Sequence, residues 1–165
     1  MKLKIALLFF VLLIASVAFA ATNTVNSKEL GFTATFPGVV NTVTDENLTA
    51  FDGYNADKTE GGFIGVIFTD LSKTTVDKDY VKHTTMDAAQ SAGVTLSEGH
   101  SGTFQDYPAG LARGTMTNEK GVTINVVMLV IVAKDRNLIY ILSALYAEGA
   151  PGTEAKAFFD SFQLQ

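Results

Sequence analysis

Cysteine is absent from this 165-residue chain, and proline, histidine and arginine are scarce. The lack of cysteine excludes disulfide bonds, thiolate catalysis and thiolate metal sites. It also excludes a lipoprotein, whose processing site needs a cysteine for acylation. No pair of arginines precedes the first apolar stretch, so the twin-arginine export route is excluded as well. Packing alone must therefore hold the fold together.

Positive charge is also in short supply. The chain has 12 basic and 17 acidic residues, which gives a formal net charge of −5. Without Lys2 and Lys4, which lie in the N-terminal leader, ten basic residues face 17 acidic ones and the net charge becomes −7. This acidity disfavours nucleic acid and anionic lipid surfaces as partners, and no run of Lys or Arg offers a local exception.

The N-terminus has the pattern of an export signal. Two lysines precede an apolar stretch from Ile5 to Val17, and Ala18-Phe19-Ala20 has the small-x-small pattern of a cleavage site. We therefore predict a secretory signal peptide over residues 1–20, cleavage near Ala20, and a periplasmic or secreted protein. A retained membrane anchor is the alternative, but no cluster of charges follows the stretch to stop transfer.

Residues 21–165 have a length typical of one domain, enough to bury about 68 to 70% of the surface that the unfolded chain exposes. The sequence contains no internal repeat, low-complexity tract or linker. The stretch from Val126 to Leu145 is apolar enough to suggest a membrane span. However, Lys134 to Asn137 would place three charges at its centre, each costing about 2.5 to 3.5 kcal/mol. We predict a single domain with a buried hairpin at this position.

The first half of this domain has the patterns of short β-strands. After a polar lead-in at Thr22 to Lys28, residues Leu30 to Phe36 alternate apolar and polar side chains, which predicts a strand with one buried face. Leu48 to Asn55 and Phe63 to Thr69 are two further predicted strands. The polar, glycine-containing stretch Asp57 to Gly62 separates them and predicts a loop between antiparallel neighbours.

Two segments have helical periodicity. In Asp77 to Ala92, the residues Val81, Thr85 and Ala88 recur at helical spacing, and Gly93 occupies a C-cap position. The second apolar stripe, after Pro151-Gly152, consists of Ala155, Phe158, Phe159 and Phe162. Its spacing of i, i+3, i+4 and i+7 predicts an amphipathic helix. Both helices are expected to pack on a sheet.

Four strand segments lie between the two helices. They are Val94 to Phe104, Gly110 to Thr117, Val122 to Ala133 and Leu138 to Tyr146. Turn residues between them, among them Asp106-Tyr107-Pro108, predict a meander. The last two segments are apolar on both faces, which predicts that they pair at the centre of the sheet. The sequence therefore predicts an α+β fold, an antiparallel sheet of about six to seven strands with helices packed on its faces.

Three stretches carry a family resemblance. They are ELGFTATFPG at Glu29 to Gly38, YPAGLARG at Tyr107 to Gly114, and AKAFFDSFQL at Ala155 to Leu164. In this order they resemble the opening strand, a mid-chain strand and the closing helix of PsbP-like domains, many of which are bacterial exported proteins. The resemblance covers nearly all of residues 21–165. It implies a PsbP-like fold and a non-catalytic accessory or binding module, and it assigns no binding residue.

The histidines and the arginines form no recognisable catalytic or metal motif. His83 is expected on the solvent side of its helix, and His100 at a strand end or in a loop, each without a second histidine at i+3 or i+4. Arg113 could hold an anionic ligand, but an outward strand position is expected. Asn47-Leu48-Thr49 has the form of a glycosylation acceptor, which matters only in a eukaryotic secretory pathway.

Asp70, Asp77 and Asp79 form the only local carboxylate cluster of the sequence. Such oxygen ligands suit Ca²⁺, although the spacing fits no EF-hand loop. Carboxylates at a helix start also interact favourably with the helix dipole, so capping is the expected role of Asp77 and Asp79.

These observations predict an exported, non-enzymatic accessory or binding module of the cell envelope, which binds a protein partner or a small ligand. We assign no catalytic residue, no cofactor-binding residue and no metal ligand, and we expect no cofactor. Two alternatives stay open. One is an envelope hydrolase or isomerase that uses carboxylates brought together by folding, and the other is a divalent-metal-responsive accessory protein that uses the three aspartates.

Overall fold

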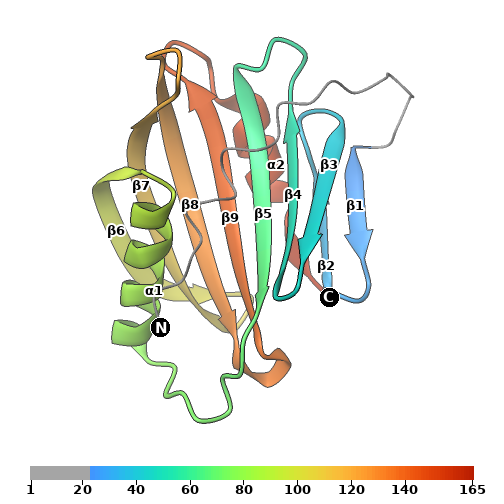
Figure 1. Ribbon diagram of the computed structural model, residues 1–165, viewed down its shortest axis with the longest axis vertical. Coiled ribbons are helices and arrows are strands. Elements are labelled where there is room, and N and C mark those ends of the chain that lie inside the picture. The colour runs from blue at the N-terminus through green and yellow to red at the C-terminus, as the bar shows by residue number, and fades with distance from the viewer. Residues whose placement is uncertain (1–22) are drawn as a thin grey trace.

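The computed structural model describes residues 23–165, which form two antiparallel sheets and two α-helices (Figure 1). The predicted signal peptide over residues 1–20 and its cleavage near Ala20 lie outside the described residues. The predicted α+β class is confirmed.

Seven strands form the larger sheet, in the spatial order β3-β4-β5-β9-β8-β7-β6, and all neighbours are antiparallel. The strands are β3 (Val40–Asp45), β4 (Leu48–Tyr54), β5 (Glu60–Phe68), β6 (Thr95–Phe104), β7 (Tyr107–Thr117), β8 (Thr123–Ala133) and β9 (Leu138–Ala147). β8 and β9 pair near the centre, as their apolar residues on both faces predict. A short 3-10 turn, η1 (Lys134–Arg136), connects them.

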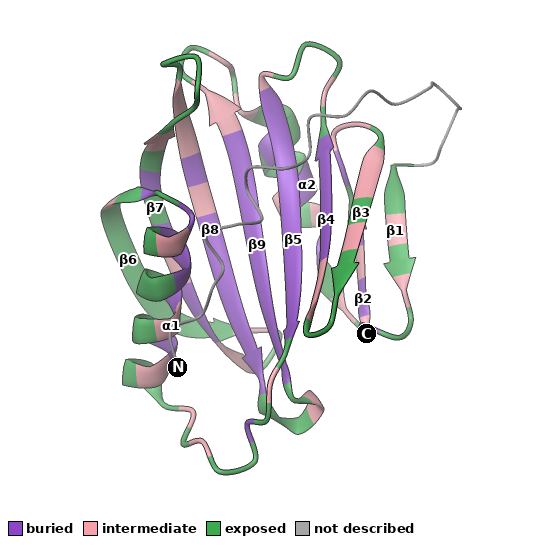
Figure 2. Ribbon diagram, viewed as in Figure 1, coloured by how far each residue is buried: buried purple, intermediate pink, exposed green. Residues whose placement is uncertain are grey.

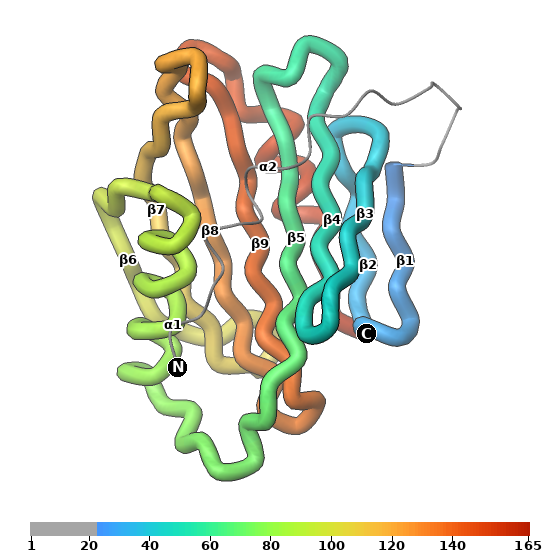
Figure 3. The backbone as a smooth tube through the Cα atoms, in the orientation of Figure 1, coloured from blue at the N-terminus to red at the C-terminus, as the bar shows by residue number. Residues whose placement is uncertain are grey.

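A second, smaller sheet packs against the larger one. It contains β1 (Thr24–Ser27), β2 (Phe32–Thr35) and β10 (Gln163–Leu164), in the order β1-β2-β10. The predicted alternation is confirmed in β2, where Phe32 and Ala34 are buried while Thr35 is exposed. Figure 3 shows β1 and β2 on the side of the molecule opposite β6. The sequence did not predict that β2 belongs to a sheet of its own.

The two helices cover opposite faces of the larger sheet (Figure 1). Helix α1 (Lys78–Ser91) packs on β6, β7 and β8, and helix α2 (Thr153–Ser161) packs on β5, β9 and β2. Each helix approaches the sheet at a glycine. A Cβ at Gly110 would overlap Thr85 of α1, and a Cβ at Gly62 would lie 2.5 Å from the Phe158 ring of α2. The predicted positions of both helices and the Gly93 cap are confirmed, except at the end of α2. That helix ends at Ser161, so Phe162 follows it in an extended conformation and Gln163–Leu164 form β10.

Two hydrophobic cores result, one on each face of the larger sheet. The core under α2 and the smaller sheet is rich in aromatic side chains, and its largest members are Phe32, Phe36, Tyr140, Phe158 and Phe162. The core under α1 is aliphatic and includes Val81, Ala88, Met128, Val130 and Ile141. Figure 2 shows the burial along β4, β5, β8 and β9 that these cores produce.

Two loops differ from the sequence prediction. The turn before β7 is formed by Gln105 and Asp106, both with positive φ, so Tyr107 and Pro108 already belong to the strand. The polar stretch before β5 is also shorter than predicted, since β5 begins at Glu60. In both places a strand extends further because neighbouring backbone pairs with it, which local composition does not reveal.

Neither helix within residues 23–165 has the length and apolar character that a bilayer crossing requires.

Candidate functional site

The histidines and Arg113 lie on the surface. His83 is exposed on α1, as expected. His100 is also exposed, but it lies inside β6 rather than at a strand end or in a loop. Its Nε2 lies 2.6 Å from Glu98 Oε1, and Arg113 Nη1 lies 3.3 Å from Glu98 Oε2. These contacts, with the His100 hydrogen bond the larger, lower the pKa of Glu98. The outward position expected for Arg113 is confirmed, and the cluster is a solvated ion-pair network.

The aspartate cluster serves local structure. Asp77 Oδ1 accepts a hydrogen bond of 2.8 Å from the backbone N–H of Tyr80, which makes Asp77 the N-cap of α1. Asp79 lies in the first turn of the helix. Asp70 Oδ1 accepts from the Ser72 backbone N–H at 2.9 Å in a separate turn. Within residues 23–165, no three His, Asp or Glu side chains are placed to hold a metal ion together.

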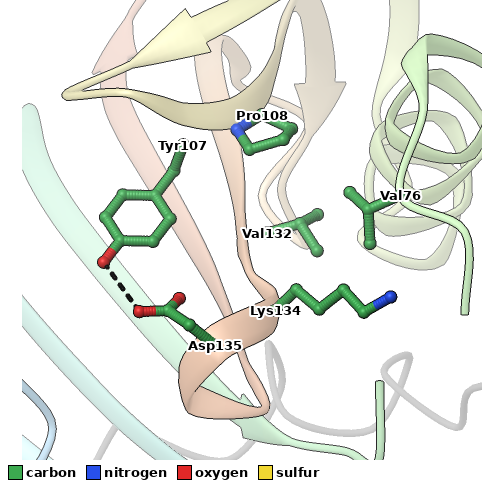
Figure 4. A pocket seen from close by; sticks show the side chains of 6 residues that line it. All are labelled: Val76, Tyr107, Pro108, Val132, Lys134 and Asp135. Carbon is green, nitrogen blue, oxygen red and sulfur yellow. Dashed lines mark hydrogen bonds between the residues drawn. The ribbon is translucent and has the colours of Figure 1, made fainter. Parts of the chain in front are cut away.

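A depression of about 490 Å³ lies at one end of the larger sheet (Figure 4). It is lined by Val76, Tyr107, Pro108, Val132, Lys134 and Asp135. Its polar groups already have partners, since Tyr107 donates a hydrogen bond of 3.3 Å to Asp135 and Lys134 donates one of 2.6 Å to the Thr74 carbonyl. Figure 4 shows Lys134 and Asp135 pointing in opposite directions. The polar groups of the depression therefore do not converge on one point.

Two carboxylates are buried in the described part of the chain, those of Asp52 and Glu60. They lie on opposite faces of the larger sheet, because Asp52 shares a face with Phe63 whereas Glu60 shares one with Gly62 and faces α2. The Glu60 carboxylate is fully used by α2, since it accepts three backbone hydrogen bonds from the start of that helix. The Asp52 carboxylate is different.

Asp52 lacks a sufficient hydrogen-bond partner. It is 5% exposed, and its Oδ1 is buried without any partner. Its Oδ2 accepts one long hydrogen bond of 3.5 Å from Asn41 Nδ2 on β3. On β5, the other neighbour of β4, Phe63 is the residue paired with Asp52. Because buried polar atoms in folded proteins almost always have partners, the free Oδ1 requires an explanation.

Aromatic rings border Asp52 on two sides. Tyr54 lies two residues further along β4, so its side chain is on the same face. Its ring lies over Gly61, where a Cβ would overlap the ring. The Phe63 ring similarly lies against Gly65, where a Cβ would be 3.2 Å from Phe63 Cε1. The glycines of β5 thus let both rings lie close to the sheet. We call Asn41, Asp52, Tyr54 and Phe63 the Asp52 site.

The Asp52 site is electrically negative. Burial raises the pKa of Asp52, and the Asn41 hydrogen bond opposes this only in part. Burial of the Tyr54 hydroxyl, together with the charge of Asp52, raises the pKa of Tyr54 to about 12. The strands that form and adjoin the site, β3, β4, β5 and β9, contain no Lys or Arg. No cation on these strands compensates the carboxylate.

A second buried polar atom lies in the same cross-strand row. Ser143 on β9 faces Phe63 from the side opposite Asp52, and its Oγ is buried without a partner. Phe63 separates the two residues, so Ser143 is not part of the Asp52 site. Helix α1 lies over β6, β7 and β8, and no helix among residues 23–165 lies over β4 and β5 on this face (Figure 1).

Sequence reasoning missed the Asp52 site. A signal was present in β4, where the period of two places Leu48, Ala50, Asp52 and Tyr54 on one face. An aspartate on the same strand face as a buried alanine, here Ala50, is unusual for a strand with one buried face. Only the fold shows that β5 pairs with β4 and that glycines of β5 lie beside the aromatic rings.

No protein-family model matches the chain, and no curated protein sequence matches it. Solved structures resemble its fold. Cyanobacterial PsbP (CyanoP) from Synechocystis sp. PCC 6803 has a TM-score of 0.58 at 10% identity, covering 92% of this chain and 99% of that one. The Saccharomyces cerevisiae Ran-binding protein Mog1p has a TM-score of 0.52 at 11% identity, covering 87% and 96%.

A third match is a protein from Bacteroides thetaiotaomicron, with a TM-score of 0.47 at 14% identity. The match covers 82% of this chain and 45% of that protein. The likeness to CyanoP extends over almost the whole length of both chains. The fold of this protein therefore resembles that of PsbP.

Proposed function

We propose that the protein is an exported, non-enzymatic binding module of the cell envelope and that it takes a small ligand at the Asp52 site. The observation that carries the proposal is the Oδ1 atom of Asp52, which is buried without a hydrogen-bond partner on a sheet face that α1 leaves uncovered over β4. A ligand that donates a hydrogen bond to this atom would complete the site.

An unpaired buried carboxylate oxygen destabilises the folded protein. Leaving such a group without a partner costs about 1 to 3 kcal/mol, and more when it is charged. A binding site explains why the group is tolerated, because the ligand supplies the missing donor and recovers part of that free energy on binding. Asn41 alone, at 3.5 Å, is too distant to satisfy the carboxylate.

The fold is compatible with a binding role. One protein of similar fold is named for binding Ran, and another is a cyanobacterial PsbP. At 10 to 11% identity these likenesses concern the fold, so neither partner is transferred to this chain. An acid–base enzyme receives less support, because the buried carboxylates of Asp52 and Glu60 lie on opposite faces of the sheet.

The N-terminal leader supports the proposed export of the protein. Residues 1–20 have the charge, apolar core and small-x-small pattern of a signal peptide. N-terminal sequencing of the exported protein is expected to begin close to Ala21. An intact Met1 on membrane-bound material would show that the leader is kept as an anchor.

A thermal-shift screen of small molecules tests the binding function. Wild-type protein, Asp52→Asn and the control Asp45→Asn are screened in parallel, since Asp45 is an exposed aspartate of β3 on the same sheet. Ligands of the site should raise the melting temperature of the wild type and of Asp45→Asn but not of Asp52→Asn. If no compound separates Asp52→Asn from the other two, the site binds no small ligand. Crosslinking in the envelope fraction would then test for a protein partner.

A further inference from the structure

We propose that the ligand of the Asp52 site is a small organic ammonium compound, a protonated amine attached to an apolar body. This inference rests on the proposed binding function and specifies the chemistry of its ligand. The charge of the site, its missing hydrogen-bond donor and its aromatic neighbours support this chemistry.

The charge of the site favours a cation. The Asp52 carboxylate has no Lys or Arg on its own strand or on β3, β5 and β9. An anion would place two negative charges together in surroundings from which water is largely excluded, which is costly. A neutral ligand would leave the carboxylate without a counter-charge. A ligand with a single positive charge matches the single carboxylate of the site.

The missing donor favours an amine over other cations. Asp52 Oδ1 has no hydrogen-bond partner, and Oδ2 has only the long contact with Asn41. A protonated amine carries N–H groups that can donate directly to Oδ1, and such charge-assisted hydrogen bonds are stronger than neutral ones. A quaternary ammonium ion has the charge but no donor, so it would leave Oδ1 unpaired.

The walls of the site favour an apolar body next to the amine. Tyr54 keeps 38% of its surface exposed, and its ring rests on the backbone of Gly61. Its position two residues from Asp52 puts the ring within reach of the same ligand. A cation beside a tyrosine ring gains about 0.5 to 1 kcal/mol at exposed sites. Phe63, the cross-strand neighbour of Asp52 on the same face, is an apolar and largely buried residue.

The partly exposed side chains of the Asp52 site lie on β3 and β4. Asn41 and Tyr54 are both partly exposed, and they flank the buried carboxylate. β3 is the edge strand of the larger sheet, and β4 and β5 follow it. The site, which has residues on these three strands, therefore lies at that edge. A compact ligand can therefore reach Asp52 without displacing α1, which packs on β6, β7 and β8.

Binding of phenethylammonium to the purified exported protein tests the proposal. Its neutral analogue 2-phenylethanol and its anionic analogue 3-phenylpropionate have nearly the same shape, so they isolate the contribution of the positive charge. Isothermal titration gives the dissociation constants, and backbone amide NMR shifts locate the binding. We expect phenethylammonium to bind most tightly and to shift amides around Asp52, Tyr54 and Phe63.

Three variants connect this binding to the site. Asp52→Asn should weaken phenethylammonium binding about tenfold or more, because a charged hydrogen bond is lost. Tyr54→Leu, which keeps an apolar side chain, should weaken it by about two- to fivefold through loss of the ring. Asp45→Asn should leave binding unchanged. Cooperative thermal unfolding of each variant establishes that it is folded.

Several outcomes would overturn the proposal. They are equal binding of phenethylammonium and 2-phenylethanol, binding that is insensitive to Asp52→Asn, and amide shifts that lie elsewhere. A protein lysine carries the same charged group, so tighter binding of N-acetyl-lysine amide than of phenethylammonium would indicate a protein ligand instead. If the thermal-shift screen finds a ligand of another class that depends on Asp52, the binding function stands and only the amine chemistry is wrong.

Discussion

Glu60 at the start of β5 caps the helix that contains Ala155. Its Oε2 accepts a hydrogen bond of 3.0 Å from the Ala155 backbone N–H and one of 2.6 Å from Glu154. Its Oε1 accepts one of 3.0 Å from Gly152. Gly152 occupies the N-cap position of α2 and has no side chain with which to cap the helix. A carboxylate 92 residues earlier in the chain therefore supplies the N-terminal cap.

Glu60→Gln should lower the free energy of unfolding by about 1.5 to 3 kcal/mol, measured by urea denaturation. The amide keeps the size of the side chain but loses one acceptor oxygen and the negative charge that faces the helix dipole. The control is Glu154→Gln, an exposed acidic residue in the first turn, for which a loss of about 1 kcal/mol or less is expected. Equal losses of unfolding free energy in the two variants would show that Glu60 acts only through its negative charge and not through its hydrogen bonds to the helix.

Asp52→Asn should stabilise the protein at neutral pH by about 1 kcal/mol, because it removes a buried charge that lacks a partner. Burial raises the pKa of Asp52 in the folded protein, so the carboxylate destabilises the fold at every pH above that raised pKa. As the pH falls through the folded pKa and below the ordinary value of 3.8, this penalty disappears.

Urea denaturation at several pH values measures this effect. The stability difference between Asp52→Asn and the wild type should be largest near pH 7 and should shrink toward zero in acid. A difference that does not change with pH, or a variant that is less stable than the wild type at pH 7, would contradict an uncompensated carboxylate. A variant that is more stable yet fails to bind ligand is typical of a functional residue.

Gly62→Ala should destabilise the protein by about 1 to 3 kcal/mol through overpacking. A Cβ at this position would lie 2.5 to 2.7 Å from three atoms of the Phe158 ring, which is fully buried between α2 and the sheet. Gly102→Ala on β6 is the matched control, because its Cβ would have no atom within 4 Å. Thermal or urea unfolding compares the two variants, and similar losses in both would exclude the packing explanation.

Asp77→Ala should lower the unfolding free energy by about 1 kcal/mol, since the N-cap hydrogen bond to Tyr80 is lost. Asp77→Asn should remain close to the wild type, because asparagine is an equally good cap. The same variants separate capping from metal binding. A melting temperature of the wild type that rises with added Ca²⁺, and fails to rise in Asp77→Asn, would favour the metal-responsive alternative.

Much of the larger sheet could be predicted from sequence because its signals are local. The apolar residues on both faces of β8 and β9 indicate central strands, and the spacing of Val81, Thr85 and Ala88 indicates α1. The cap at Asp77 and the glycine at position 93 gave the ends of that helix. Each of these signals lies within the element that it predicts.

The elements that were missed depend on distant partners. β1 is polar and β10 has only two residues, and both exist because β2 offers them backbone groups to pair with. β3 has no clear alternation and is ordered by pairing with β4. Propensity is a weak guide for such edge strands, because what stabilises them is the neighbouring strand.

The candidate site was missed for the same reason. Asp52 looks unremarkable in a list of 17 acidic residues, and only the pairing of β4 with β3 and β5 shows that it is buried beside Asn41 and Phe63. Likewise, Glu60 reads as part of a polar loop until α2 is placed over it. Burial of a charge is a property of the assembled sheet.

The smaller sheet imposes an order on folding. Thr33 of β2 pairs with Gln163 of β10, 130 positions later in the chain. During synthesis, β2 leaves the ribosome long before its second partner has been made, so this sheet can be completed only after residues 163–164 are released. Pairings of such long range also form slowly, because the loop that they close is large. The smaller sheet is therefore expected to be completed after the local hairpins of the larger sheet.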